Sequence, residues 1–340
     1  MKKTNPIMPT TVIGSHANPS WMWSAIDEIN AGNYGITDIK ETYDDAVDIA
    51  ILDQTKAGID IITDGEMRRS NFIQSFYKKM TGLEIREPLR KTGLTSYDSH
   101  IRYICKEKIT LPNGLGINEE FLYTKAHTKK QIKITCPGPL TLTIHIKPEK
   151  PYKSRLDLAW EFSKIINSEL KELVDNGADF IQIDEPSFAI VPGELNEWIK
   201  LFNETVKDVQ AKIALHICFG NLTSRPRGNR TYKWMFPELT NANTDQLVLE
   251  FANREMKEVE IWQEFANQME LSAGVVDVKS FYVETPKDVA SKIDEILKFG
   301  PAEKLLLNPD CGFSQLPRWI TKLKLEALVE GTKIARGLIN

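Results

Sequence analysis

The sequence predicts an α/β protein built as a (β/α)8 TIM barrel, with residues 1–340 forming a single barrel catalytic domain. Short apolar runs rich in β-branched residues recur along the chain, and segments of helical length separate them. Such alternation is typical of parallel strands joined by helical crossovers. An open doubly wound sheet is the alternative, but no Gly-x-Gly-x-x-Gly motif opens a helix here. A barrel therefore explains the pattern best.

Each predicted strand is an apolar run that ends in polar, Gly or Pro residues. In chain order the strands are Thr10–Gly14, Asp60–Thr63, Gln131–Thr135, Asp179–Ile183, Lys212–Ile217, Gln246–Glu250, Leu271–Val276 and Lys304–Leu307. Each predicted helix has apolar residues at helical spacing among charged ones. The helices are Asp38–Ala57, Ser154–Asn176, Leu195–Ala211, Lys257–Gln268, Pro286–Phe299 and Leu316–Gly337.

The stretch between Asn71 and Lys130 is too long to be one connection. It contains a mixed run at Tyr103–Leu111, the turn residues Pro-Asn-Gly, and a second mixed run at Ile117–Lys125. Turn chemistry between two such runs predicts a β-hairpin. We place this hairpin in an insertion at about residues 75–130, after the second strand, where it caps one end of the barrel.

Composition limits the possible functions. A net charge of −4 offers no general attraction for nucleic acid, so no nucleic-acid partner is expected. No apolar run of about 20 residues is present and the first residues lack the apolar core of a signal peptide, so we expect no membrane association. Four cysteines in 340 residues are not a disulfide framework, which favours a reducing cytoplasm. Cys105 and Cys136 are expected to be structural, and the chain to be a monomer or homodimer.

Polar or sulfur residues follow the predicted strands, at the face where barrel active sites gather. His216 and Cys218 are two residues apart on one strand, so their side chains point to the same face. Glu250 and Cys311 lie near the ends of two later strands. If these strands are neighbours, one imidazole, two thiols and one carboxylate converge, which are zinc ligands.

The chemistry of this set predicts what a zinc ion there would do. Two thiolates and a carboxylate outweigh the charge of Zn²⁺, so the metal is a poor acid for water but still deprotonates an added thiol. Such a site suits thiol alkylation better than hydrolysis. A regulatory disulfide between Cys218 and Cys311 is the alternative, and a reducing compartment disfavours it.

The combined motifs resemble the catalytic domain of the cobalamin-independent methionine synthases, over nearly the whole chain. The matching motifs are Asp64-Gly-Glu66, Gly138-Pro-Leu-Thr141, Ile181-Gln-Ile-Asp-Glu-Pro186, His216-Ile-Cys218 and Asn308-Pro-Asp-Cys-Gly312. The resemblance implies that zinc is held by His216, Cys218, Glu250 and Cys311. It also implies that Glu66 and Asp184 hold the amino group of L-homocysteine, and that Ser15 lies near its carboxylate. The single barrel is similar to the short core enzymes of that family.

Two departures from the family pattern concern the methyl donor. His145 stands where the family has a Trp that stacks on the folate pterin, and Lys279 replaces the His of an Asp-Ile-His-Ser element. Both changes undercut methyltetrahydrofolate, so we expect methylcobalamin or a corrinoid carrier protein as donor, with folate as the alternative. Lys279 is then a candidate catalytic residue and His145 a candidate binding residue; the alternatives are a Lys279 that pairs with Asp277 and a His145 that lies on a solvated loop.

A second family branch, the epoxyalkane:coenzyme M transferases, is similar at Gly220-Asn221 and Glu250-Phe-Ala. That function requires a cationic pocket for a sulfonate, and Arg68 or Arg69 would supply it. The loop Asn221–Arg230 carries three arginines, which suit a corrinoid, an acidic carrier protein or simply solvent. A non-catalytic protein with a structural zinc is the remaining possibility; its metal would be closed to ligands.

Overall fold

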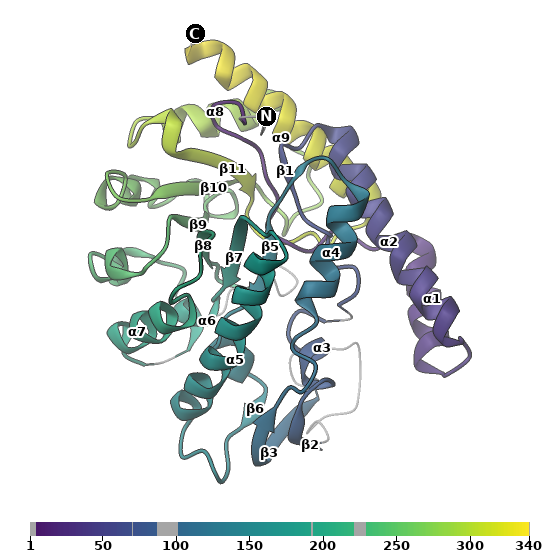
Figure 1. Ribbon diagram of the computed structural model, residues 1–340. Coiled ribbons are helices and arrows are strands. Elements are labelled where there is room, and N and C mark those ends of the chain that lie inside the picture. The colour runs from purple at the N-terminus through teal and green to yellow at the C-terminus, as the bar shows by residue number, and fades with distance from the viewer. Residues whose placement is uncertain (1–4, 70, 87–100, 192, 221–228, 340) are drawn as a thin grey trace.

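The structure is a computed structural model that describes residues 5–69, 71–86, 101–191, 193–220 and 229–339, with side chains to residue 337 (Figure 1). Parallel strands form the predicted barrel, with helices outside it. The barrel strands are β1 (Ile61–Ile62), β4 (Gln131–Ile132), β5 (Ile134–Pro137), β7 (Phe180–Asp184), β8 (Lys212–Ile217), β9 (Gln246–Glu250), β10 (Glu270–Val276) and β11 (Leu305–Pro309).

The strands follow one another around the barrel in chain order. One sheet runs β11-β10-β9-β8-β7-β5, and β4, which pairs with β1, directly precedes β5 in the chain. The N-terminal segment closes the ring, because Thr10 bridges to Leu307 of β11 and Thr11 bridges to Ile61 of β1. The predicted first strand is therefore reduced to isolated bridges, and the predicted third strand is split at Lys133.

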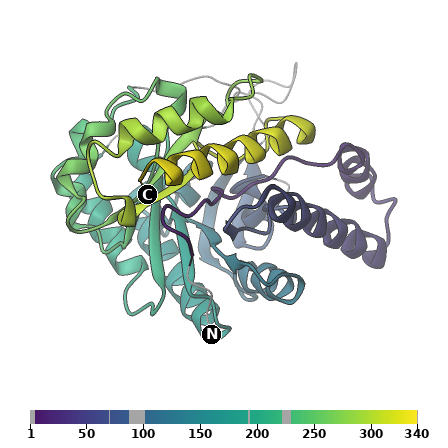
Figure 2. The same ribbon diagram turned by 90° about the horizontal axis from the view of Figure 1, so that it is seen from above.

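The helices surround the barrel, and both views place α1 at the edge of the molecule beside α2 (Figures 1 and 2). Their bounds are α1 Ser20–Asn30, α2 Ile36–Ala57, α3 Gln74–Tyr77, α4 Ile117–His127, α5 Arg155–Asp175, α6 Ser187–Ile190, α7 Leu195–Thr205, α8 Pro286–Ile296 and α9 Arg318–Ile339. None of the helices in the described ranges is both long and apolar enough to cross a bilayer.

A small apolar cluster precedes the polar site residues along the barrel strands. It takes one residue from the N-terminal segment and one from each of five strands: Ile13, Ile61, Phe180, Ala214, Val248 and Leu306. Side chains two residues apart on a strand share a face. His216 therefore follows Ala214 on one face, and Glu250 follows Val248, so the strands carry their polar residues toward the C-terminal end of the barrel.

The hairpin predicted from residues 103–111 and 117–125 is wrong. The second run forms α4, and β3 (Arg102–Thr110) pairs instead with the preceding β2 (Thr81–Arg86) in antiparallel fashion, with β6 (Ile146–Lys147) on its other edge. The physical reason lies in the tertiary structure. Glu169 of α5 accepts hydrogen bonds from the backbone N–H groups of Leu115 and Ile117, each at 2.8 Å, and so caps the start of α4.

The predicted helix at Lys257–Gln268 is also wrong, since this stretch contains the short 3-10 helix Val259–Glu264. Backbone φ angles are positive at Glu255, Met256 and Glu258, which an α-helix does not tolerate. The sequence prediction missed α1, whose N-cap is Pro19 and has no side-chain capping bond. Helix α7 ends at Thr205, six residues before the predicted end at Ala211.

Candidate functional site

Three of the four predicted metal ligands come together at the C-terminal end of the barrel. His216 lies on β8, Cys218 directly follows that strand, and Cys311 follows β11. One ligand atom from each lies within 4.8 Å of the other two, and the two sulfur atoms are 4.0 Å apart. All three side chains are buried or half-buried. The arrangement matches a nitrogen and two sulfurs around one ion.

A neighbouring carboxylate fixes the orientation of the His216 ring. Asp184 stands opposite His216 in the β7–β8 register, and its Oδ1 lies 2.7 Å from Nδ1. The other ring nitrogen, Nε2, is buried and has no hydrogen-bond partner. A carboxylate on one imidazole nitrogen and a metal on the other is a recurrent arrangement. The unpartnered Nε2 beside two thiols therefore fits a metal ion.

Glu250, the fourth predicted ligand, lies outside this close group. It is fully buried, and Lys279 Nζ lies 2.9 Å from its Oε1 and 2.8 Å from its Oε2. The Lys279 backbone N–H donates to Asp277 Oδ1 at 2.7 Å, so the side-chain pairing expected with Asp277 is replaced by pairing with Glu250. The positive charge of Lys279 and the negative charge of Glu250 compensate each other in a site shielded from water, as buried ions require.

The two thiols of the group differ in acidity. Their mutual hydrogen bond, together with the charges of His216 and Lys279, lowers the pKa of Cys311 to about 7 despite burial. The same hydrogen bond and burial raise the pKa of Cys218 well above its usual range. Burial alone lowers the pKa of His216, but the Asp184 carboxylate outweighs it and the pKa is raised. Cys311 is therefore the more acidic of the two thiols.

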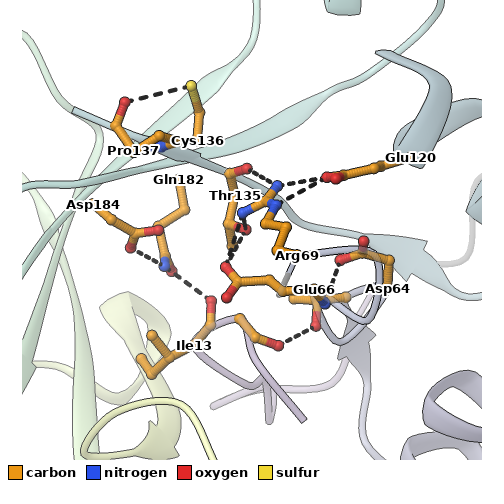
Figure 3. Close-up of polar contacts among 12 residues, drawn as sticks. Ile13, Asp64, Glu66, Arg69, Glu120, Thr135, Cys136, Pro137, Gln182 and Asp184 are labelled. Carbon is orange, nitrogen blue, oxygen red and sulfur yellow. Dashed lines mark hydrogen bonds and ion pairs between the residues drawn. The ribbon is translucent and has the colours of Figure 1, made fainter. Parts of the chain in front are cut away.

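Glu66 and Asp184 are two neighbouring carboxylates (Figure 3), and Asp184 connects them to the metal-binding group through its contact with His216. Glu66 Oε1 accepts hydrogen bonds from Thr135 Oγ1 at 2.7 Å and from Arg69 Nη1 at 3.0 Å. Asp184 Oδ1 accepts from Gln182 Nε2 at 2.7 Å, in addition to its bond to His216. Within the described residues, Glu66 Oε2 and Asp184 Oδ2 receive no hydrogen bond.

The backbone at Glu66 is unusual for a non-glycine residue, with a φ of 53°. Such conformations are costly and collect at functional sites. Burial raises the pKa of Glu66 to about 7, with the negative charge of Asp184 adding to the rise and Arg69 opposing it. Two like charges with one open oxygen each attract a cation, because an ammonium group would relieve their repulsion.

The two arginines considered for a sulfonate pocket are both engaged elsewhere. Arg68 forms an ion pair with Asp44 and lies 4.5 Å from the centre of the Tyr123 ring. Arg69 is buried between Glu66 and Glu120. Both guanidinium groups are already paired with carboxylates, so these contacts do not favour the sulfonate pocket that the coenzyme M alternative requires.

The remaining predicted site residues are placed as follows. Ser15 adjoins the metal-binding group, because its carbonyl accepts from Phe313 N at 2.7 Å and a side chain at Gly312 would collide with its Oγ. His145 is half-buried and precedes β6, where its carbonyl accepts from Tyr103 N. Of the arginine-rich loop, residues 221–228 lie outside the described residues. Arg230 donates to Asn253 Oδ1 at 2.5 Å.

Sequence reasoning missed a residue that holds the site together. Asp310, next to Cys311, is buried and accepts hydrogen bonds from the backbone N–H groups of residues 251, 252 and 253, at 2.6 to 2.9 Å. It connects the loop after Glu250 to the segment after β11 that contains Cys311. The sequence contains one indication of this role, because Asp310 is the Asp of the Pro-Asp-Cys-Gly motif. Glu185, the residue after Asp184, accepts hydrogen bonds from the backbone N–H groups of Leu140 and Thr141.

The fold and the site define a (β/α)8 barrel with a histidine, two thiols and paired carboxylates at the C-terminal ends of its strands. Residues 8–334 match the family model described as the catalytic domain of the cobalamin-independent synthases. A methionine synthase of Sulfurisphaera tokodaii is 36% identical over 332 residues, which cover 97% of this chain and 93% of that protein. The chain therefore belongs to the cobalamin-independent methionine synthase family.

Solved structures agree with this assignment. A B12-independent methionine synthase from Shewanella sp. W3-18-1, in complex with selenomethionine, has a TM-score of 0.85 at 29% identity and covers 98% of this chain and 99% of that one. A putative vitamin-B12 independent methionine synthase from Listeria monocytogenes has a TM-score of 0.70 at 19% identity, covering 98% and 99%, and supports the fold alone.

The expectation of methylcobalamin or a corrinoid carrier protein as methyl donor is wrong. The matching family and the Shewanella enzyme are described as cobalamin-independent and B12-independent. The expectation depended on His145 and Lys279. Because the ammonium group of Lys279 is paired with Glu250, the presence of Lys at this position reflects the charge of Glu250 and does not identify the donor.

Proposed function

We propose that this protein is a zinc-dependent methyltransferase that moves a methyl group from a cobalamin-free donor to the thiol of L-homocysteine, giving methionine. Methyltetrahydrofolate, the alternative donor considered from the sequence, is the candidate. The observation that carries the proposal is the grouping of His216, Cys218 and Cys311 with an unpartnered Nε2 on His216. The methionine synthases at 36% identity support the reaction.

His216, Cys218 and Cys311 would hold the metal, with Glu250 the fourth candidate ligand. Bound zinc would supply Lewis acidity that keeps a coordinated substrate thiol in its thiolate form at neutral pH. Asp184 holds the His216 ring by its Nδ1, so that Nε2 is presented to the group. Lys279 offsets the charge of Glu250 in a buried environment.

The substrate's amino acid end is assigned to the carboxylate pair. The open oxygens of Glu66 and Asp184 would accept charge-assisted hydrogen bonds from the ammonium group, and Ser15 lies on the side of Cys311 and Gly312. Binding of that end would hold the homocysteine sulfur beside the group formed by His216, Cys218 and Cys311, and would remove much of the entropy cost of the reaction. In the reaction a sulfur–carbon bond forms, and the donor keeps the electron pair of the bond that breaks.

A donor comparison tests this function. Zinc-loaded protein is given L-homocysteine with methyltetrahydrofolate, and methionine is measured by mass spectrometry. We expect turnover that chelation abolishes and zinc restores. A matched variant pair sharpens the result: Cys311→Ser should be inactive, whereas Cys105→Ser, which alters a buried thiol in β3, should retain activity. Methionine formation that survives complete zinc removal would refute the proposal.

A further inference from the structure

Arg69 is buried within the protein at the edge of the candidate substrate site (Figure 3). All three of its guanidinium nitrogens are used. Nη1 donates to Glu66 Oε1 and to Thr135 Oγ1, each at 3.0 Å. Nη2 donates to the Thr135 carbonyl and to Glu120 Oε2, each at 2.7 Å, and Nε donates to the same Glu120 oxygen at 3.0 Å. No nitrogen of this side chain remains to bind a substrate anion.

Glu120 brings the insertion into contact with this site. It is buried on α4, a helix whose start is capped by Glu169 of the outer helix α5. Glu120 therefore has a defined position relative to the barrel. Two N–H groups of the planar guanidinium, Nε and Nη2, converge on the single oxygen Oε2 of Glu120 and orient the group, which the single ammonium of a lysine does not reproduce. The insertion thus sets the direction in which Arg69 points.

The same contacts decide which oxygen of Glu66 is available. Arg69 and Thr135 occupy Oε1, which leaves Oε2 as the open oxygen. In Figure 3 the Glu66 carboxylate lies on the side of Arg69 turned toward Asp184. Gly14 allows this placement, because a Cβ there would come within 2.5 Å of Glu66 Oε1. The carboxylate has little freedom to rotate away from Asp184.

We propose that Arg69 and Glu120 are positioning residues that hold Glu66 in the orientation that recognises the amino group of the thiol substrate. The proposal rests on the proposed function and adds to it a source of substrate specificity. Arg69 also supplies the positive charge that favours the ionised form of Glu66 against burial. A thiol with an α-amino group would gain from this arrangement, and a thiol without one would not.

The test compares two methyl acceptors in the zinc-loaded full-length protein: L-homocysteine and 4-sulfanylbutanoate, which lacks only the amino group. The variants are Arg69→Gln, Arg69→Lys and Glu120→Gln. We expect Arg69→Gln and Glu120→Gln to raise the KM for homocysteine roughly tenfold or more, the loss typical of a charge-assisted hydrogen bond. For 4-sulfanylbutanoate, both kcat and KM of these two variants should equal those of the unmodified protein. Arg69→Lys, which keeps the charge but not the planar fork, should fall between Arg69→Gln and the unmodified protein.

Arg68→Gln is the matched control, since Arg68 is the adjacent residue and its partners are Asp44 and Tyr123. It should retain the preference for homocysteine. If Arg69→Gln does not fold, as judged by its thermal midpoint, Glu120→Gln decides the question. An equal loss for both acceptors, or no loss for either, overturns the proposal. If the unmodified protein does not methylate homocysteine, the proposed function itself fails.

Discussion

Comparing Asp184→Asn with Glu66→Gln separates metal binding from substrate binding, because Asp184 contacts the group that would hold the metal, whereas Glu66 has no hydrogen bond to it. Asp184 Oδ1 lies 2.7 Å from His216 Nδ1, and the two side chains are 3% and 5% exposed. The Asn side chain keeps the shape but loses the charge. Glu66→Gln makes the same chemical change on the other side of the proposed ammonium site, where no contact with His216 is present.

The magnitude follows from the contact that is weakened. A hydrogen bond to a charged group contributes about 1.5–3 kcal/mol. A carboxylate that supports a metal-binding imidazole accounts for about 10- to 100-fold in metal affinity, which corresponds to roughly 1.4–2.7 kcal/mol. The two estimates agree, so Asp184→Asn should weaken zinc binding by about 10- to 100-fold. Both Asp184→Asn and Glu66→Gln should raise the KM for homocysteine.

Competition with a chromophoric chelator measures the zinc affinity of each variant, and initial rates give the KM for homocysteine. The expected pattern is loss of both properties in Asp184→Asn and loss of substrate affinity alone in Glu66→Gln. Unchanged zinc affinity in Asp184→Asn would show that the carboxylate does not support the metal through His216. Equal zinc loss in both variants would show that the change is a general structural one.

Three further predictions concern other parts of the molecule. Cys311→Ser should lose stoichiometric zinc together with activity, and elemental analysis that finds full zinc occupancy in this variant would contradict the ligand assignment. Glu66 has a pKa raised to about 7 by burial, so it loses its charge as pH falls through that value and cannot bind an ammonium group. The KM for homocysteine should therefore rise about tenfold per pH unit below 7, measured against 4-sulfanylbutanoate, which should show no such rise. Ser154→Ala removes the side-chain cap of α5 and should lower the free energy of unfolding by about 1 kcal/mol, measured in urea, with no change in KM.

The predictions that succeeded depended on local patterns. The apolar spacing among charged residues after Ser154 predicted α5, and the observed helix differs by one residue at each end. Strand β8 was predicted with its observed bounds, so the period-two placement of His216 and Cys218 was sound. Chain order along a parallel barrel then brought Cys311 near them.

The predictions that failed depended on contacts with distant segments. The run at 117–125 forms a helix because Glu169, about fifty residues later, caps it. Positive φ values at Glu255, Met256 and Glu258 replace the helix predicted at 257–268 by a 3-10 helix. Neither effect leaves a mark in the hydrophobic spacing of the segment concerned, which reports only which face of an element is buried.

By itself, the sequence determined the barrel, the family and the types of side chain available for chemistry. Those features follow from periodicity and residue identity, which are local properties. Only the tertiary structure decided which partner each charged group has: Lys279 with Glu250, Asp184 with His216, and Arg69 between Glu66 and Glu120. The reason is that a buried charge is stable only when it is paired, and the available partner is set by packing between segments that are far apart in the chain.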